Sequence, residues 1–187
     1  MENKKSLSAI MIFAFLAMFL STSTVSAENV CEGNLSNPKV IQNLKAELKK
    51  TYNEGSSKKS RKYAVKYPSS FSLEKVDGDN GIFVGSIMLI GESDMQGLPI
   101  VSINPIGEGQ YYPPAEGSKT MDVTIGGKHA KWTSWWVNVG SSGCFEQGEV
   151  RFNKTPKGWA STGYISYAAK SEDMEIVKNI INSIKVK

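Results

Sequence analysis

The sequence predicts an α+β fold in which an antiparallel β-sheet of about six to seven strands is sandwiched between an N-terminal and a C-terminal helix. Two stretches, near residue 40 and near residue 177, carry apolar residues at helical spacing. Between them, apolar runs of strand length alternate with turns rich in glycine, proline and asparagine. Two terminal helices that lay their apolar stripes on one sheet account for both observations.

The first helix is expected from Ser36 to about Thr51. Ser36 and Asn37 are capping residues, and Pro38 fits the first turn because no backbone N–H is needed there. Apolar residues then recur at helical spacing, with lysine and glutamate between them. A polar loop, residues 53–60, follows this helix.

Strands are expected across the middle of the chain. From Arg61 the apolar period changes to two, which is typical of a half-buried strand. Later runs either alternate or are apolar throughout, and the pair Gly126-Gly127 predicts a hairpin turn. The expected strands cover residues 61–67, 81–90, 98–103, 121–125, 128–137, 149–153 and 159–168, and residues 71–73 form a short extended piece.

Two loops and a second helix complete the pattern. Residues 104–119 are rich in proline and glycine, and loops of this length are often functional. Residues 140–148 form another expected loop, which carries Cys144. The last helix is expected to begin at Ser171, because two acidic residues follow in its first turn and an apolar stripe continues from there.

The first 27 residues are typical of a signal peptide. Two lysines precede an apolar run, residues 10–20, and small residues close the segment at Ala27. The apolar run is too short to span a hydrocarbon core of about 30 Å. We therefore expect no transmembrane segment, cleavage after Ala27, and an exported protein that is periplasmic or secreted.

The chain beyond the leader has the length of one domain. It divides into an N-terminal segment, residues 28–60, with the amphipathic helix and a basic loop, and an α/β domain, residues 61–187. The net charge of +4 does not by itself indicate a polyanionic partner, and we expect no specific nucleic-acid partner. The segment from Lys45 to Lys66 is locally basic, however, and either attracts an anionic surface or is a solvated helix end and loop.

The two cysteines, Cys31 and Cys144, predict one disulfide, because an even pair in an oxidising compartment is normally bonded. A two-cysteine metal site and a reactive thiol are the alternatives. A metal site needs further ligands, and His129 is the only histidine of the chain. We therefore expect the disulfide, and neither a metal nor a cofactor.

Three motifs follow one another in an order that resembles the PsbP-like family. They are the strand end Tyr67-Pro68-Ser69-Ser70-Phe71, the glycine hairpin at residues 123–130, and the closing helix at residues 180–186. This family comprises an extrinsic luminal subunit of photosystem II and many small exported bacterial proteins. The resemblance covers about residues 63–186 and implies an α/β/α sandwich. It also implies an accessory or binding subunit without chemistry of its own.

The search for catalytic residues yields one candidate base, His129. A serine hydrolase needs such a histidine beside its nucleophile, but the sequence Gly140-Ser141-Ser142-Gly143 has the wrong spacing for a nucleophile elbow. The turn at residues 77–81 resembles a calcium loop without its closing glutamate, since Met88 stands at that position. A small envelope hydrolase that uses His129 is therefore the alternative to a non-catalytic binding protein.

Aromatic residues mark the expected partner site. Trp135 and Trp136 lie in one expected strand, and Tyr111 and Tyr112 lie in the long loop. Alternation places Trp136 on the same strand face as Trp132 and places Trp135 on the other face. Because aromatic anchors dominate recognition, we expect these four residues to bind a protein or envelope component, unless they cover the core instead.

Overall fold

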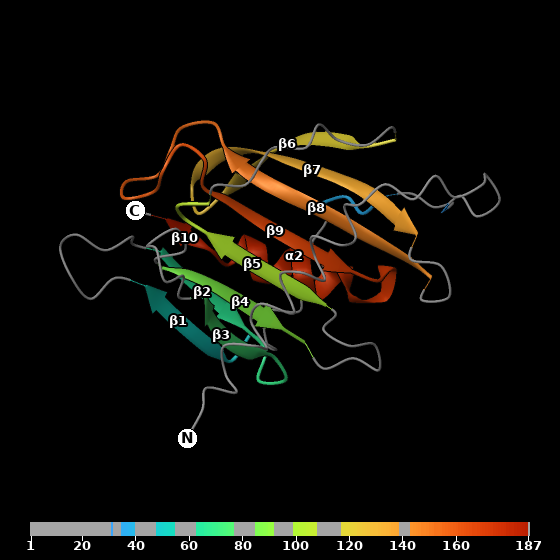
Figure 1. Cartoon of the computed structure of the whole chain (residues 1–187), viewed down its shortest axis with the longest axis horizontal. Helices are drawn as coiled ribbons and strands as arrows, with labels where there is room; N and C mark the ends of the chain where they lie inside the picture. Colours follow the sequence, from blue (N-terminus) through green and yellow to red (C-terminus); the bar gives the residue numbers. More distant parts are fainter. Residues whose placement is uncertain are drawn as a thin grey trace, which may run out of the picture.

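The computed structural model describes residue 31 and residues 35–39, 48–54, 63–76, 85–91, 99–107, 117–138 and 143–186. These residues form two antiparallel sheets and one α-helix (Figure 1). No helix in this part of the chain is both long enough and apolar enough to cross a membrane.

The large sheet has seven strands in the order β3-β4-β5-β9-β8-β7-β6, and every neighbouring pair is antiparallel. The pair Gly126-Gly127 joins β6 to β7 with positive φ at both glycines, which is the backbone that a tight hairpin requires. The strands are β3 (Ser72–Val76), β4 (Ser86–Ile90), β5 (Ile100–Asn104), β6 (Lys119–Ile125), β7 (Lys128–Asn138), β8 (Cys144–Phe152) and β9 (Tyr164–Ala169).

The small sheet brings together strands from distant parts of the sequence. Its order is β1-β2-β10, with β1 (Lys50–Glu54), β2 (Tyr63–Tyr67) and β10 (Lys185–Val186). The alternation predicted for β2 is confirmed, because positions 63, 65 and 67 are buried while Lys66 is exposed.

The helix α2 (Met174–Asn182) follows a short 3-10 turn, η3 (Ser171–Asp173), and packs on one face of the large sheet (Figure 1). We call this face the inner face and the opposite one the outer face. The apolar stripe of α2 joins inner-face side chains such as Val101, Ile165 and Trp132 in a single core. The C-terminal helix predicted from the sequence is therefore present.

The predicted fold class is wrong. The described residues are mostly strand, with one short helix on one face, and they do not form a sheet sandwiched between N- and C-terminal helices. Of the expected first helix, residues 40–47 lie outside the described residues, whereas its expected end, Lys50 and Thr51, belongs to β1. Pairing with β2 satisfies the backbone groups of β1 that face β2, so the tertiary contact overrides the helical spacing.

Two further boundaries differ from the sequence prediction. Cys144 was expected in a loop but is the first residue of β8. Trp159 was expected to begin a strand, yet β9 begins only at Tyr164. The intervening chain is held instead by a turn bond from the N–H of Gly163 to the carbonyl of Ala160 and by a bond from the Ala160 N–H to the Pro105 carbonyl.

Gly148, at the middle of β8, lets the ring of Tyr167 lie across the strand. A Cβ at this position would lie 2.4 Å from the carbonyl oxygen of Thr133 and 2.6 Å from the hydroxyl of Tyr167. One of these is backbone on a neighbouring strand, so it cannot move without disturbing the ladder.

We expect Gly148→Ala to lower the free energy of unfolding by about 2–3 kcal/mol, at the upper end of the usual cost of overpacking a core. Urea unfolding followed by circular dichroism measures this change. Gln147→Ala, on the same strand but the outer face, is the matched control and should change the stability by about 0.5 kcal/mol or less. Equal effects of the two substitutions would contradict the conclusion that a side chain at position 148 clashes with β7 and Tyr167.

Candidate functional site

The predicted disulfide is confirmed. Cys31 and Cys144 are bonded, with their Cα atoms 5.7 Å apart and 113 residues between them in the sequence. The bond joins the N-terminal part of the chain to the start of β8. Because the sulfur of Cys144 is in this bond, it is not available as a thiol nucleophile.

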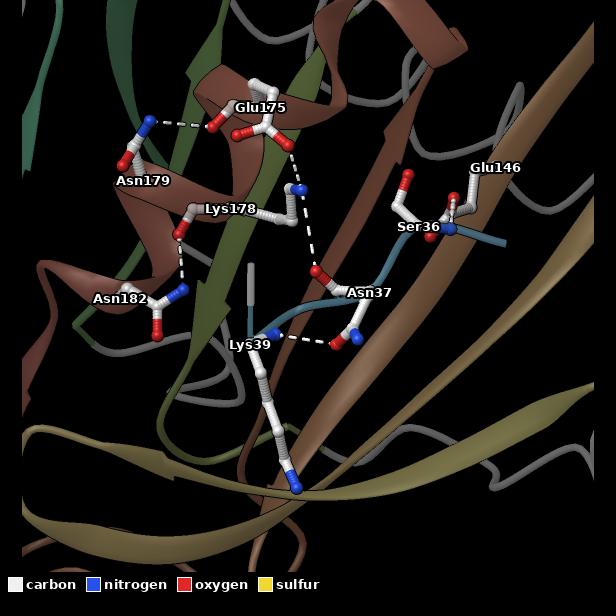
Figure 2. Close-up of polar contacts among 8 residues, drawn as sticks. All are labelled: Ser36, Asn37, Lys39, Glu146, Glu175, Lys178, Asn179 and Asn182. Atoms are coloured by element: carbon white, nitrogen blue, oxygen red, sulfur yellow. Dashed lines mark hydrogen bonds and ion pairs between the residues drawn. The ribbon is translucent and has the colours of Figure 1, made fainter. Parts of the chain in front are cut away.

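Residues 35–39 cross the inner face beside α2 (Figure 2). We call Cys31 and residues 35–39 the strap. The backbone N–H of Ser36 donates to Oε2 of Glu146 at 2.8 Å, and Nζ of Lys178 donates to the carbonyl of Asn37 at 3.5 Å. The side chain of Asn37 accepts from the N–H of Lys39 at 3.0 Å, which shapes a local turn.

Both side chains that hold the strap are charged and buried. Glu146 is 0% exposed and Lys178 is 3% exposed. Lys178 also forms an ion pair with Glu175, one turn earlier on α2. Such groups are costly to bury unless their hydrogen-bonding capacity is used, and here backbone groups of the strap use part of it.

Glu146 also belongs to a buried polar network on the inner face. Nε1 of Trp132 donates to the hydroxyl of Tyr167 at 2.9 Å, and that hydroxyl donates to Oε1 of Glu146 at 2.9 Å. The rings of Trp132 and Tyr167 lie 5.2 Å apart, centroid to centroid. The carboxylate therefore has one partner in β9 and one in the strap, so the network links the sheet to the strap.

The four aromatic residues predicted for the partner site do not form one group among the described residues. Tyr111 and Tyr112 lie outside the described residues. Trp135 and Trp136 are both half-buried, but Trp136 is opposite Glu146 and points to the inner face, while Trp135 is opposite Gln147 and points to the outer face. A single flat surface can therefore include only one of these two tryptophans.

Beside the predicted Trp135, the outer face carries polar and aromatic side chains that the sequence reasoning missed. Nε and Nη2 of Arg151 donate to the two carboxylate oxygens of Glu149 at 2.8 and 3.1 Å. The guanidinium of Arg151 also lies over the ring of Tyr164, 5.3 Å from its centroid. We call the half-buried residues Trp135, Gln147, Glu149, Arg151 and Tyr164 the outer-face patch.

Strand alternation was the available signal for this patch. Positions 147, 149 and 151 share one face of β8, because successive side chains of a strand point to opposite faces. The register places Trp135 beside Gln147, and it places the start of β9 next to the end of β8. The sequence alone did not reveal which strand lies beside which.

The basic segment from Lys45 to Lys66 is described only in part. Lys49 and Lys66 are exposed, whereas Nζ of Lys50 donates to the carbonyl of Ser69 at 2.8 Å and so holds the turn after β2. The remaining bases of the segment lie outside the described residues. The ammonium of Lys50 therefore serves to hold this turn.

The candidate base His129 is exposed on β7, with Thr124 of β6 as its cross-strand neighbour. The nearby acid Asp122 is paired with Lys131, and this ammonium lowers the pKa of the Asp122 carboxyl. No group of three or more potential metal ligands gathers among the described residues, and the turn at residues 77–81 lies outside them.

No family model matches this chain, and a search of curated proteins finds no relative by sequence.

Three tyrosines have raised pKa values: Tyr63 and Tyr167, which are buried, and Tyr164, which is half-buried. Burial raises the pKa of Tyr63, of Tyr164 and of Tyr167, and for Tyr167 the neighbouring carboxylate of Glu146 raises it further. Each phenol has a folded-state pKa above its unfolded value of 10.0. The stability due to the neutral phenols is thus fully present below pH 10 and is lost as the pH rises above it.

We therefore expect alkaline unfolding, in which each phenol that remains protonated only in the fold costs about 1.4 kcal/mol for every pH unit above its unfolded pKa. Tyrosinate absorbance recorded together with circular dichroism should show these tyrosines ionising only as the fold is lost. Tyr63→Phe should move the transition to higher pH. Ionisation of all tyrosines near pH 10 with the fold intact would contradict this expectation.

Proposed function

We propose that this chain is an exported, non-catalytic binding protein of the cell envelope or secreted fraction, which recognises a protein or envelope component through the outer-face patch. The arrangement of Arg151 carries the proposal. Its guanidinium is fixed by a two-point pair with Glu149 and stacked on Tyr164, and all three side chains are only half-buried.

A fixed arginine on an aromatic ring suits recognition better than a mobile surface charge does. Binding a partner usually costs side-chain entropy, and the contacts with Glu149 and Tyr164 already restrict Arg151. Arginine, tyrosine and tryptophan are also the residue types that contribute most to protein interfaces. The half-buried Trp135 and the amide of Gln147 extend the same face along β7 and β8.

Export is the second part of the proposal. The disulfide supports it, because such bonds persist mainly in oxidising compartments. The leader-like residues 1–27 support it as well, and mass spectrometry of the secreted protein would test for a mature chain that begins at Glu28. The described residues do not form the sandwich that the resemblance to the PsbP-like family implied, so the resemblance adds no support to this proposal.

The rival function, a small envelope hydrolase that uses His129, has less support in the geometry. The histidine is exposed, its cross-strand neighbour is a threonine, and the carboxylate of Asp122 is engaged by Lys131. A triad needs the acid to orient the histidine, and this acid has another partner.

Trp135→Ala and Arg151→Ala should each weaken partner binding at least about tenfold, as expected when a central aromatic or arginine anchor is removed. Quantitative crosslinking from the native envelope, with each variant present in equal amount, measures the change. Lys154→Ala is the matched control, because Lys154 is an exposed base just beyond β8, and it should leave binding unchanged.

Comparing the patch variants with His129→Ala, in the crosslinking assay and in the native phenotype, distinguishes the two functions. If His129→Ala abolishes the native phenotype while the protein remains folded, and the patch variants do not affect it, the binding proposal is wrong and the hydrolase is favoured. If the patch variants fold normally yet capture the same partners equally well, the outer-face patch is not the binding surface.

A further inference from the structure

The strap is attached to the domain at only a few points. Among the described residues, it has one covalent link, between Cys31 and Cys144. It also has two hydrogen bonds to the domain, from Ser36 to Glu146 and from Lys178 to Asn37 (Figure 2). Pro38, between these contacts and Lys39, is buried. The described residues of the strap are not paired in either sheet.

The remainder of the fold has its own connections. β8 pairs with β7 along its whole length, and β9 pairs with β8 and β5. The core is built mainly from the strands and α2, and none of its described members is a strap residue. Loss of the strap therefore leaves the sheet ladders and the apolar core complete.

The noncovalent contacts of the strap are opposed by the hydration of its partners. Glu146 and Lys178 are buried charged groups, and water around them would replace the hydrogen bonds that the strap backbone supplies. Burying a charge costs much of what its interactions return. The disulfide favours the strap in this competition, because it keeps Ser36 and Asn37 close to Glu146 and Lys178 and so raises the effective concentration of the strap at these side chains.

The disulfide is open to exchange. Cys144 is exposed and Cys31 is half-buried, so a small thiolate can reach the bond. A dithiol reductant attacks one sulfur to form a mixed disulfide, and its second thiol then displaces the protein. The net transfer is two electrons and two protons to Cys31 and Cys144, which become thiols, while the reductant becomes a disulfide.

We propose that the Cys31–Cys144 disulfide is a redox clasp whose reduction by a dithiol releases the strap from the inner face and hydrates Glu146 and Lys178, while both sheets and α2 stay folded. This inference is independent of the proposed binding function, because the strap lies on the inner face and the patch on the outer face.

Hydrogen–deuterium exchange of the purified protein, with and without dithiothreitol, tests the clasp. In the oxidised protein the amide of Ser36 should be protected by its bond to Glu146. Reduction should speed exchange there at least tenfold and leave the amides of β8, β9 and α2 unchanged. Cys31→Ser should show the same fast exchange without reductant, and adding dithiothreitol to this variant should have no further effect.

A second variant tests the cause of release. Glu146→Gln removes the charge but keeps an acceptor for the Ser36 amide, so it should slow strap exchange in the reduced protein. Two results would overturn the proposal. Continued protection of Ser36 after reduction would show that noncovalent contacts hold the strap. Fast exchange of all strands together would show that the disulfide supports the whole fold.

Discussion

The pairing of β8 with β7 on one side and β9 on the other is the constraint on which the rest of the structure depends. It fixes which residues share a face: Glu146 and Gly148 lie on the inner face, and Glu149 and Arg151 lie on the outer face. The gap at Gly148 admits the ring of Tyr167, and the hydroxyl of that ring reaches Glu146. A shift of one residue in this register would exchange the two faces and bury the wrong charges.

The same register places buried, hydrogen-bonded charged groups on the inner face and a half-buried ion pair on the outer face. On the inner face, charged groups are buried and bonded to backbone or phenol, so they specify one arrangement of the sheet, the strap and α2. On the outer face, the pair of Glu149 with Arg151 remains half-buried. Both side chains still reach solvent, with 27% of Arg151 and 16% of Glu149 exposed, which leaves them available for recognition.

Local patterns in the sequence predicted the elements that depend on local physics. Alternation located β2, and the Gly126-Gly127 pair located the hairpin of β6 and β7. The two cysteines in an expected exported chain predicted the disulfide. The failures depend on contacts between distant residues. β1 forms because β2 pairs with it, despite helical spacing before it. Glu146 was not predicted to be buried, because its partners are 21 and 110 residues away in the sequence.

The strands of the small sheet come from distant parts of the sequence, and this has a consequence for biosynthesis. Its central strand, β2, pairs with β1 on one edge and with β10, at residues 185–186, on the other. The ribosome must therefore make all of residues 50–186 before this sheet can close, and contacts of such long range form slowly. Under the export proposed above, a chain that completes its fold late would remain longer in the unfolded form that a narrow translocation channel accepts.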